Sequence, residues 1–226
     1  MKVEQIIKEN TGVDDLNLPG YQHDDGLTKE GHPAHEAIRA DMRMFADDLR
    51  EMYPSACKFL DIGSGAGYLS ERIREWDSTG RPPYTAVTLD GNRETINLPS
   101  INKDYHFIVR TDQPYQLVVD GWANMVFDVI TSFEHFEHIH PDHFPQFIEN
   151  IKKHMHKDSV LYASAAKWKY QEVDRVHINV KPEFLWKIEM ENYGFVELDK
   201  KLFNERNTSN CKLRWSETAE LAYKLK

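Results

Sequence analysis

The sequence predicts an α/β fold in which helices cover both faces of a mostly parallel sheet. Short apolar runs rich in β-branched residues alternate along the chain with stretches whose apolar residues recur at helical spacing. Such alternation is typical of strands joined by helices in a parallel, doubly covered sheet. The last two apolar runs have no helical stretch between them. This absence predicts an antiparallel hairpin at the end of the sheet.

The expected elements follow from these two periodicities. Residues 1–10 are consistent with a short amphipathic helix, and residues 11–33, rich in glycine and polar residues, are expected to form a loop. Further helices are predicted over residues 33–52, 68–76, 142–156 and 182–193. Strands are predicted over residues 58–62, 84–89, 105–110, 126–131, 159–164, 195–202 and 219–225. Pro182 in the first turn and Gly194 just past the end support the last helix.

Composition limits the class of protein. The length of 226 residues suits one domain with a sizeable core, and the net charge of -9 disfavours nonspecific binding to nucleic-acid phosphates. No apolar stretch approaches the ~18 residues that a membrane-spanning helix needs. The two cysteines, Cys57 and Cys211, have no metal-binding spacing and indicate a reducing compartment. We therefore expect a cytoplasmic protein with neither a membrane nor a nucleic-acid partner.

The most informative local pattern is a glycine-rich turn between a strand and a helix. Gly63, Gly65 and Gly67 follow the strand at alternate positions, and Asp61 stands two residues before the first of them. Glycines allow a ligand to approach the backbone, and the next helix offers free N–H groups to an anion. The spacing differs from the GxGxxG of dinucleotide sites, and Asp61 disfavours a pyrophosphate. The pattern favours a ligand with an ammonium group, although a turn without a ligand is the alternative.

The segment Asp61-Ile-Gly63-Ser-Gly65-Ala-Gly67 resembles motif I of class I S-adenosylmethionine (SAM)-dependent methyltransferases. Leu89-Asp90-Gly91, Thr111-Asp112-Gln113 and residues 127–139 resemble the family's next motifs, in the same order. The resemblance covers residues 55–226. It implies SAM as the cofactor and a Rossmann-like three-layer sandwich with a mostly parallel seven-stranded sheet and a C-terminal antiparallel hairpin. It further implies one methyltransferase domain over residues 34–226, preceded by a lid or loop segment over residues 1–33.

The resemblance also implies which residues bind the cofactor. They follow the first four strands of the sheet: Asp61, Gly63, Ser64, Gly65, Gly67, Asp90, Gly91, Asp112, Gln113 and Phe133. Asp90 takes the place of the family's ribose-binding carboxylate, and Asp112 the place beside the adenine. Because the register between Arg110 and Val126 is ambiguous, Asp120 competes with Asp112 for the second role. We prefer Asp112 because it ends the cleaner strand.

A hydroxyl acceptor needs a base, and histidine is the usual choice because its unperturbed pKa is near ~6.5. The candidate catalytic residues are His138 and His177, and the candidate substrate-binding residues are Glu134 and Asn179. Either histidine can instead have a structural role. We assign no metal ligand. Five aromatic residues line an acceptor pocket or belong to the core: Trp122, Phe133, Trp168, Tyr170 and Trp186.

The predicted function is methyl transfer from SAM to a small molecule, with a hydroxyl of a sugar or another metabolite as the expected acceptor. The acceptor's identity, the atom methylated, the help of a divalent cation and the oligomeric state are left open. A SAM-binding partner subunit without catalysis is one alternative. The other is a metallo-β-lactamase-like hydrolase, because His138, His140, Asp142 and His143 match the HxHxDH metal motif. That hydrolase leaves the glycine motif unexplained.

Overall fold

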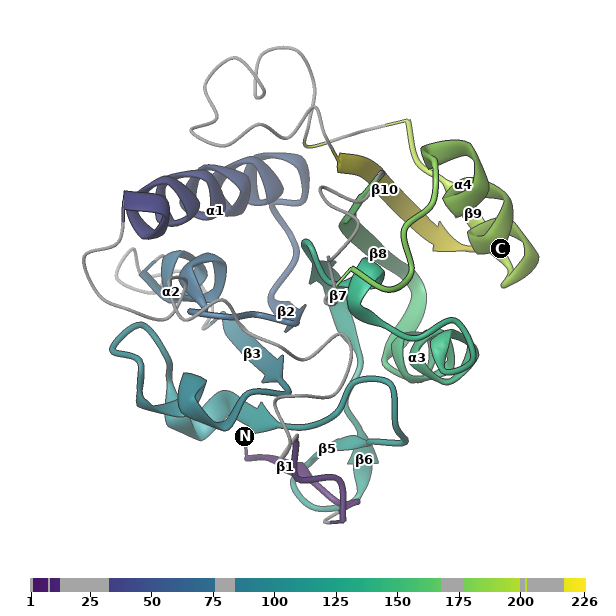
Figure 1. The fold of residues 1–226 in the computed structure, drawn as a ribbon. Coiled ribbons are helices and arrows are strands. Elements are labelled where there is room, and N and C mark those ends of the chain that lie inside the picture. Colours follow the sequence, from purple (N-terminus) through teal and green to yellow (C-terminus); the bar gives the residue numbers. More distant parts are fainter. Residues whose placement is uncertain are drawn as a thin grey trace.

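The computed structural model describes residues 2–7, 9–12, 33–75, 84–167, 177–199, 202 and 218–226. Its centre is a seven-stranded sheet with the strand order β4-β3-β2-β7-β8-β10-β9 (Figure 1). These strands are β2 (Lys58–Ile62), β3 (Thr85–Asp90), β4 (His106–Ile108), β7 (Phe127–Ser132), β8 (Met155–Ala166), β9 (Phe195–Glu197) and β10 (Thr218–Leu225). All pairs from β4 to β8 are parallel, whereas β10 runs antiparallel to β8 and β9. The predicted α/β class, parallel sheet and closing hairpin are confirmed.

Helices cover the sheet in two groups. They are α1 (Pro33–Met52), α2 (Tyr68–Glu75), α3 (Phe144–Lys153) and α4 (Glu183–Asn192). Figure 1 shows α1 beside α2, whereas α3 and α4 lie apart from this pair, and α4 lies next to β9 and β10. The buried apolar side chains form two clusters: α1 and α2 contribute to one, and α3 and α4 to the other. The chain therefore folds as a three-layer sandwich with one core on each face of the sheet. Among the described residues, no helix is long and apolar enough to cross a membrane.

The prediction of a helix over residues 1–10 is wrong. Val3–Gln5 forms strand β1, which pairs antiparallel with β5 (Leu117–Val119), and β5 in turn pairs with β6 (Ala123–Asn124). Val3 is buried in the core, and its backbone partners come from a segment more than a hundred residues away. A short stretch with such distant partners carries no local signal of strand structure. Strands β5 and β6 of this small second sheet lie in the interval between Arg110 and Val126 that the sequence left ambiguous.

The helix predicted over residues 142–156 ends earlier, because His154 turns the chain into β8. His154 is fully buried, its Nδ1 lies 2.7 Å from the carbonyl oxygen of Met125, and its ring stacks on Tyr115 at 5.6 Å. Burial lowers the pKa of His154 to about 4, so that the imidazole is neutral at physiological pH. Met155 then starts the strand. The strand predicted over 195–202 is likewise shorter, since β9 ends at Glu197.

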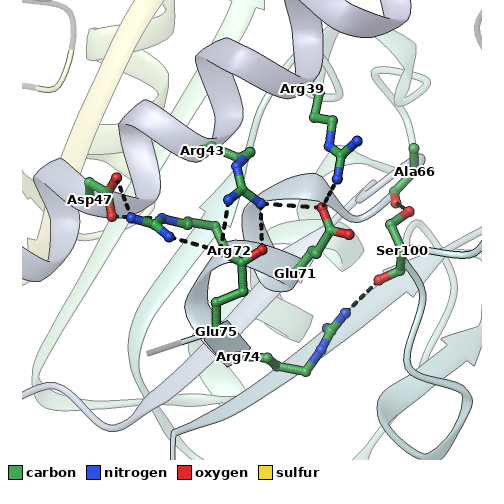
Figure 2. A network of polar contacts seen from close by, with 9 residues as sticks. All are labelled: Arg39, Arg43, Asp47, Ala66, Glu71, Arg72, Arg74, Glu75 and Ser100. Carbon is green, nitrogen blue, oxygen red and sulfur yellow. Dashed lines mark hydrogen bonds and ion pairs between the residues drawn. The ribbon is translucent and has the colours of Figure 1, made fainter. Parts of the chain in front are cut away.

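An ion-pair network holds α1 against α2 (Figure 2). Arg43 donates to both carboxylate oxygens of Glu75 at 2.7 Å, and Arg72 bridges Glu75 and Asp47. Arg39 reaches Glu71 at 3.3 Å. Single exposed pairs contribute little to stability, but Glu75 is shared by two guanidinium groups. The hydrogen bonds from Arg43, followed by those from Arg72, lower the pKa of Glu75 from 4.5 to about 2.

Replacing Glu75 with glutamine should lower the melting temperature by about 3 °C, which corresponds to roughly 1 kcal/mol for a chain of this size. Because the folded-state pKa is depressed, this contribution is present above pH 4.5 and is lost as the pH falls towards about 2. High salt should also shrink the difference. The control is Glu149→Gln, which removes one exposed pair with Lys152. Thermal melts with equal losses in the two variants would contradict a role for the network.

Candidate functional site

The glycine-rich turn lies between β2 and α2, at the carboxyl end of β2. Gly63, Gly65 and Gly67 all have positive φ angles, of 70°, 49° and 68°. The backbone N–H groups of Gly63 and Ser64 donate to the carbonyl of Leu89 at the end of β3, so the turn is fastened to the neighbouring strand. Side chains already fill the space beside the first and third glycines: a Cβ on Gly63 would lie 2.5 Å from the ring of His135, and one on Gly67 2.6 Å from Ile101.

Gly65 differs from the other two glycines, because a Cβ there would meet no atom within 4 Å. Its N–H donates to Oδ2 of Asp90 at 2.8 Å, while Oδ1 of Asp90 accepts from the N–H of Asn92. Beside it, the hydroxyl oxygen of Ser64 is buried and has no hydrogen-bond partner among the described residues. The turn thus combines an open position with a buried polar atom that lacks a partner, the combination expected of a loop that contacts a ligand through its backbone.

Asp61 precedes this turn on β2. It is 6% exposed, and its Oδ1 accepts a hydrogen bond from the hydroxyl of Thr131 on β7 at 2.8 Å. Burial raises the pKa of Asp61 from 3.8 to about 7; the bond from Thr131 opposes this shift and the charge of Asp90 adds to it. Two carboxyls therefore lie near the turn, an arrangement that a cationic ligand group would relieve.

The candidates for the adenine side follow strands of different sheets. Asp112 follows β4 of the large sheet, and its carboxylate accepts from Arg110 at 2.8 and 3.1 Å and lies 2.8 Å from Nδ1 of His143. Asn150 of α3 fixes this turn by donating to the carbonyls of Thr111 and Gln113. Asp120 lies instead between β5 and β6, where it accepts from the backbone of Lys2. Of the two, only Asp112 therefore lies beyond a strand of the large sheet.

The N-terminal segment crosses the ends of β3 and β4. The side chain of Asn10 accepts from the backbone N–H of Arg110 and donates to its carbonyl, at 2.7 and 2.8 Å. A Cβ on Gly12 would lie 2.8 Å from the carbonyl oxygen of Gly91 and 2.4 Å from Ile108. Residues 9–12 thus pack beside the candidate residue Gly91. The rest of the predicted lid, residues 13–32, lies outside the described residues, as do Trp168 and Tyr170.

His135 is a site residue that the sequence did not single out. Its ring packs beside Gly63, and its Nε2 lies 2.8 Å from the hydroxyl oxygen of Thr111, which follows β4. It therefore connects the segment after β7 to the glycine turn and to the next strand end. The neighbouring candidate Phe133 is part-buried and packs on Phe45 of α1, with ring centroids 5.6 Å apart. A single histidine among several in the segment gave no signal of this bridging position.

The acceptor-side candidates converge next to a short 3-10 helix, Phe136–His138. The rings of His138 and His177 are edge to face, with centroids 4.9 Å apart. One ligand atom from each of Glu137, His138 and His177 lies within 4.8 Å of the other two. The backbone N–H of Asn179 donates to the carbonyl of Glu137 at 2.9 Å and fixes the segment that carries His177. The structure thus brings together His138, His177 and Asn179, three of the residues that the sequence assigned to the acceptor side.

Glu134 adds a second buried acid to this region. It follows β7 with a positive φ of 48°, an uncommon conformation for a residue with a side chain. Its Oε1 accepts from the hydroxyl of Ser164 at 2.6 Å, and its N–H donates to the same hydroxyl. Burial raises the pKa of Glu134 to about 7, and burial together with repulsion from Glu134 raises the pKa of Glu137 well above its ordinary value.

The HxHxDH motif does not assemble a metal centre. His140 is half exposed, and its Nδ1 lies 3.7 Å from Asp142, whereas His143 is turned to Asp112. Among the residues that the structure describes, the group able to hold a metal contains His138 but none of the other three residues of the motif. The hydrolase alternative therefore lacks its ligand set.

Comparisons with known proteins bear on the family and the fold of this chain. A family model described as a methyltransferase domain matches residues 34–199. A SAM-dependent methyltransferase from Clostridium acetobutylicum has a similar structure, with a TM-score of 0.60 and 14% identity over 85% of this chain and 97% of its own. The mitomycin 7-O-methyltransferase MmcR has a TM-score of 0.55 and 16% identity over 88% of this chain and 60% of its own. The plantazolicin methyltransferase BpumL, solved with SAH and a desmethyl plantazolicin analogue, has a TM-score of 0.53 and 12% identity over 86% of each chain. No curated protein sequence matches the chain.

Proposed function

Because this chain belongs to the family of methyltransferase domains, we propose that it transfers a methyl group from SAM to a hydroxyl group of a small acceptor, such as a sugar or another metabolite. The observation that carries the proposal is the position of two groups of residues. The glycine turn with Asp61 and Asp90 follows β2 and β3, and the cluster around His138 follows β7 in the same sheet. Ligands of open α/β sheets bind at these carboxyl ends.

The glycine turn suits the amino-acid end of SAM. Asp61 offers a buried carboxylate for the ammonium group, and the buried hydroxyl of Ser64 has no partner in the described part of the chain. The first N–H groups of α2 favour a carboxylate. Gly65 leaves room next to Asp90, whose carboxylate already receives two backbone N–H groups and keeps further lone pairs for ribose hydroxyls.

The acceptor side supplies orientation and a place for the hydroxyl proton. Bound SAM supplies a methyl group that is already activated by its sulfonium, so the chain's main task is to hold the acceptor in line. His138 and His177 are the candidate bases for the hydroxyl proton, and Glu134 and Asn179 are candidates for fixing the acceptor. The similar fold of an enzyme named for 7-O-methylation is consistent with transfer to oxygen.

The direct test is calorimetric titration with SAM, followed by measurement of SAH release in the presence of hydroxylated sugars and metabolites. We expect micromolar binding and release of SAH with a subset of the acceptors. Binding without release for any hydroxylated, amine or thiol acceptor would favour the partner-subunit alternative. Absence of SAM binding would contradict the proposal altogether.

A matched pair of glycine variants tests the position of the cofactor. Gly65 and Gly194 both have positive φ, and a Cβ at either meets no atom within 4 Å. Replacing either glycine with alanine should therefore strain the backbone and lower the free energy of unfolding by a similar amount, about 1–2 kcal/mol. Only Gly65→Ala should also weaken SAM binding, by at least about 10-fold, since its methyl group would enter the cofactor space. Titration of both variants measures this difference, and equal affinities would place SAM elsewhere.

A further inference from the structure

The group formed by Glu137, His138 and His177 has the composition and geometry of a metal site. Its members come from two segments, the 3-10 helix after β7 and the segment before α4. The hydrogen bond from the N–H of Asn179 to the carbonyl of Glu137 holds the two segments together. One ligand atom of each residue lies within 4.8 Å of the other two. Atoms at this separation can reach a common ion with small rotations of the side chains.

A second observation points to a ligand at this place. Glu137 is completely buried, and its Oε1 accepts the N–H of Ala166 at 3.0 Å. Its other oxygen, Oε2, is also buried and receives no N–H or hydroxyl donor among the described residues. The neighbouring buried acid is Glu134, whose carboxyl lies within hydrogen-bonding reach of Glu137, so that two acids meet here and a cation would relieve their repulsion. A buried carboxylate oxygen without a donor or a cation is costly. The apolar side of this short helix, Phe136, packs on Phe144 and Trp186, so that the helix is held firmly where it is.

We propose that Glu137, His138 and His177 together bind one divalent transition-metal cation. Two imidazoles and a carboxylate favour Mn²⁺, Fe²⁺, Co²⁺ or Zn²⁺ over Mg²⁺ and Ca²⁺, which prefer oxygen ligands alone. Three protein ligands leave at least one coordination position open, as in metal sites that bind a substrate or water. The proposal departs from the sequence analysis, which assigned no metal ligand.

The consequence for the reaction rests on the proposed function. An acceptor hydroxyl at the open position would have a lowered pKa, as water has on a bound metal. Its O–H bond would then break with loss of the proton to solvent, while the oxygen forms the new bond to the methyl carbon and the methyl–sulfur bond of SAM breaks to release SAH. His138 and His177 would act as ligands in this case, and a separate base would not be required.

The test is titration of the tag-free, chelator-treated protein with CoCl₂, followed by calorimetry and by the visible absorption of Co²⁺. We expect one site per chain and an absorption change typical of nitrogen and oxygen ligands. His138→Asn and His177→Gln should each weaken binding by at least about 10-fold, since even second-shell changes have effects of this size. The control is His140→Asn, which changes a histidine of the same segment that lies outside the group. MgCl₂ added in the same molar excess over protein as CoCl₂ should not displace Co²⁺.

Two outcomes would overturn the proposal: no cobalt binding by a folded protein, or equal affinity in the two ligand variants and the wild type. Glu137→Gln provides a further check, because circular dichroism can show that it is folded before its weaker binding is interpreted. The experiment contains no SAM and no acceptor. Cobalt binding without SAM binding would therefore contradict the proposed function alone, and SAM turnover without cobalt binding would contradict the metal site alone.

Discussion

Replacing Asp61 with asparagine should weaken SAM binding by about 100-fold, because truncating one partner of a buried charge pair typically costs 2–5 kcal/mol. The fold should tolerate the change, since the asparagine carbonyl can still accept the hydrogen bond from Thr131. Asparagine carries no charge that burial penalises. The unliganded variant should therefore be at least as stable as the wild type at neutral pH.

The pH dependence has a defined sign. With a pKa of about 7 in the folded protein, Asp61 holds its proton at lower pH and offers no charge to an ammonium group. SAM affinity should thus fall as the pH decreases below about 7, and this dependence should vanish in Asp61→Asn. Stability shows the opposite trend: between pH 3.8 and 7 the unfolded chain has lost a proton that the folded chain keeps, so this carboxyl destabilises the fold increasingly as the pH rises.

Calorimetry across this pH range and thermal melts of the unliganded proteins measure the two effects. The control is Asp128→Asn on β7, at the amino end of the sheet, where the carboxylate accepts from the backbone N–H groups of Cys57 and Lys58. This variant should lose stability and keep SAM affinity. If Asp61→Asn binds SAM as well as the wild type, the ammonium group does not lie beside β2.

Replacing Trp186 with alanine should lower the free energy of unfolding by about 3–5 kcal/mol. Trp186 is fully buried and packs on Phe136 and Phe144 with ring centroids 5.9 and 5.4 Å apart, while the ammonium group of Lys181 lies 4.4 Å from its ring. Phe136 begins the short helix that carries Glu137. Loss of the indole should therefore also reduce turnover more than SAM affinity.

Trp186→Phe is the matched variant. It keeps an aromatic ring and removes the indole N–H, which is buried without a hydrogen-bond partner among the described residues. It should lower the free energy of unfolding by clearly less than Trp186→Ala does, because the phenyl ring leaves a smaller cavity and no N–H is then buried without a partner. Urea denaturation of both variants measures the difference. Similar costs for alanine and phenylalanine would show that the cavity is not the cause.

Local periodicity predicted the large sheet and its helices well. The bounds predicted for α1 and β2 coincide with the observed ones, because a helical stripe and a buried apolar run are complete signals within their own segments. Local periodicity failed to predict the structure where a residue's partner lies far away in the sequence. Val3 is a strand residue through its pairing with Val119, and His154 ends α3 through its contacts with Met125 and Tyr115.

The candidate site was also predicted in part: the local glycine turn was found, and the contacts between distant residues were not. The glycine turn was located correctly by its spacing, and the cofactor roles of its residues remain predictions. The resemblance placed Asp112 beside the adenine, yet the structure shows its carboxylate paired with Arg110 and His143, two partners that spacing does not reveal. Of the aromatic residues, Trp186 belongs to the core, whereas Trp122 is 83% exposed on the small sheet. Whether such a tryptophan is buried or exposed depends on which elements pack against it, and a single sequence does not show these contacts.

The position of β10 between β8 and β9 affects how the chain can fold during its synthesis. β9 leaves the ribosome before β10, yet β10 is its only strand partner among the described residues, and β8 has one open edge until β10 arrives. During synthesis, the nascent chain therefore presents an apolar strand with unpaired backbone groups, which is a template for association with other chains. Slower translation of residues 198–217 would prolong this exposure, so that the yield of soluble protein should depend on codon choice there and on the chaperones that cover such edges.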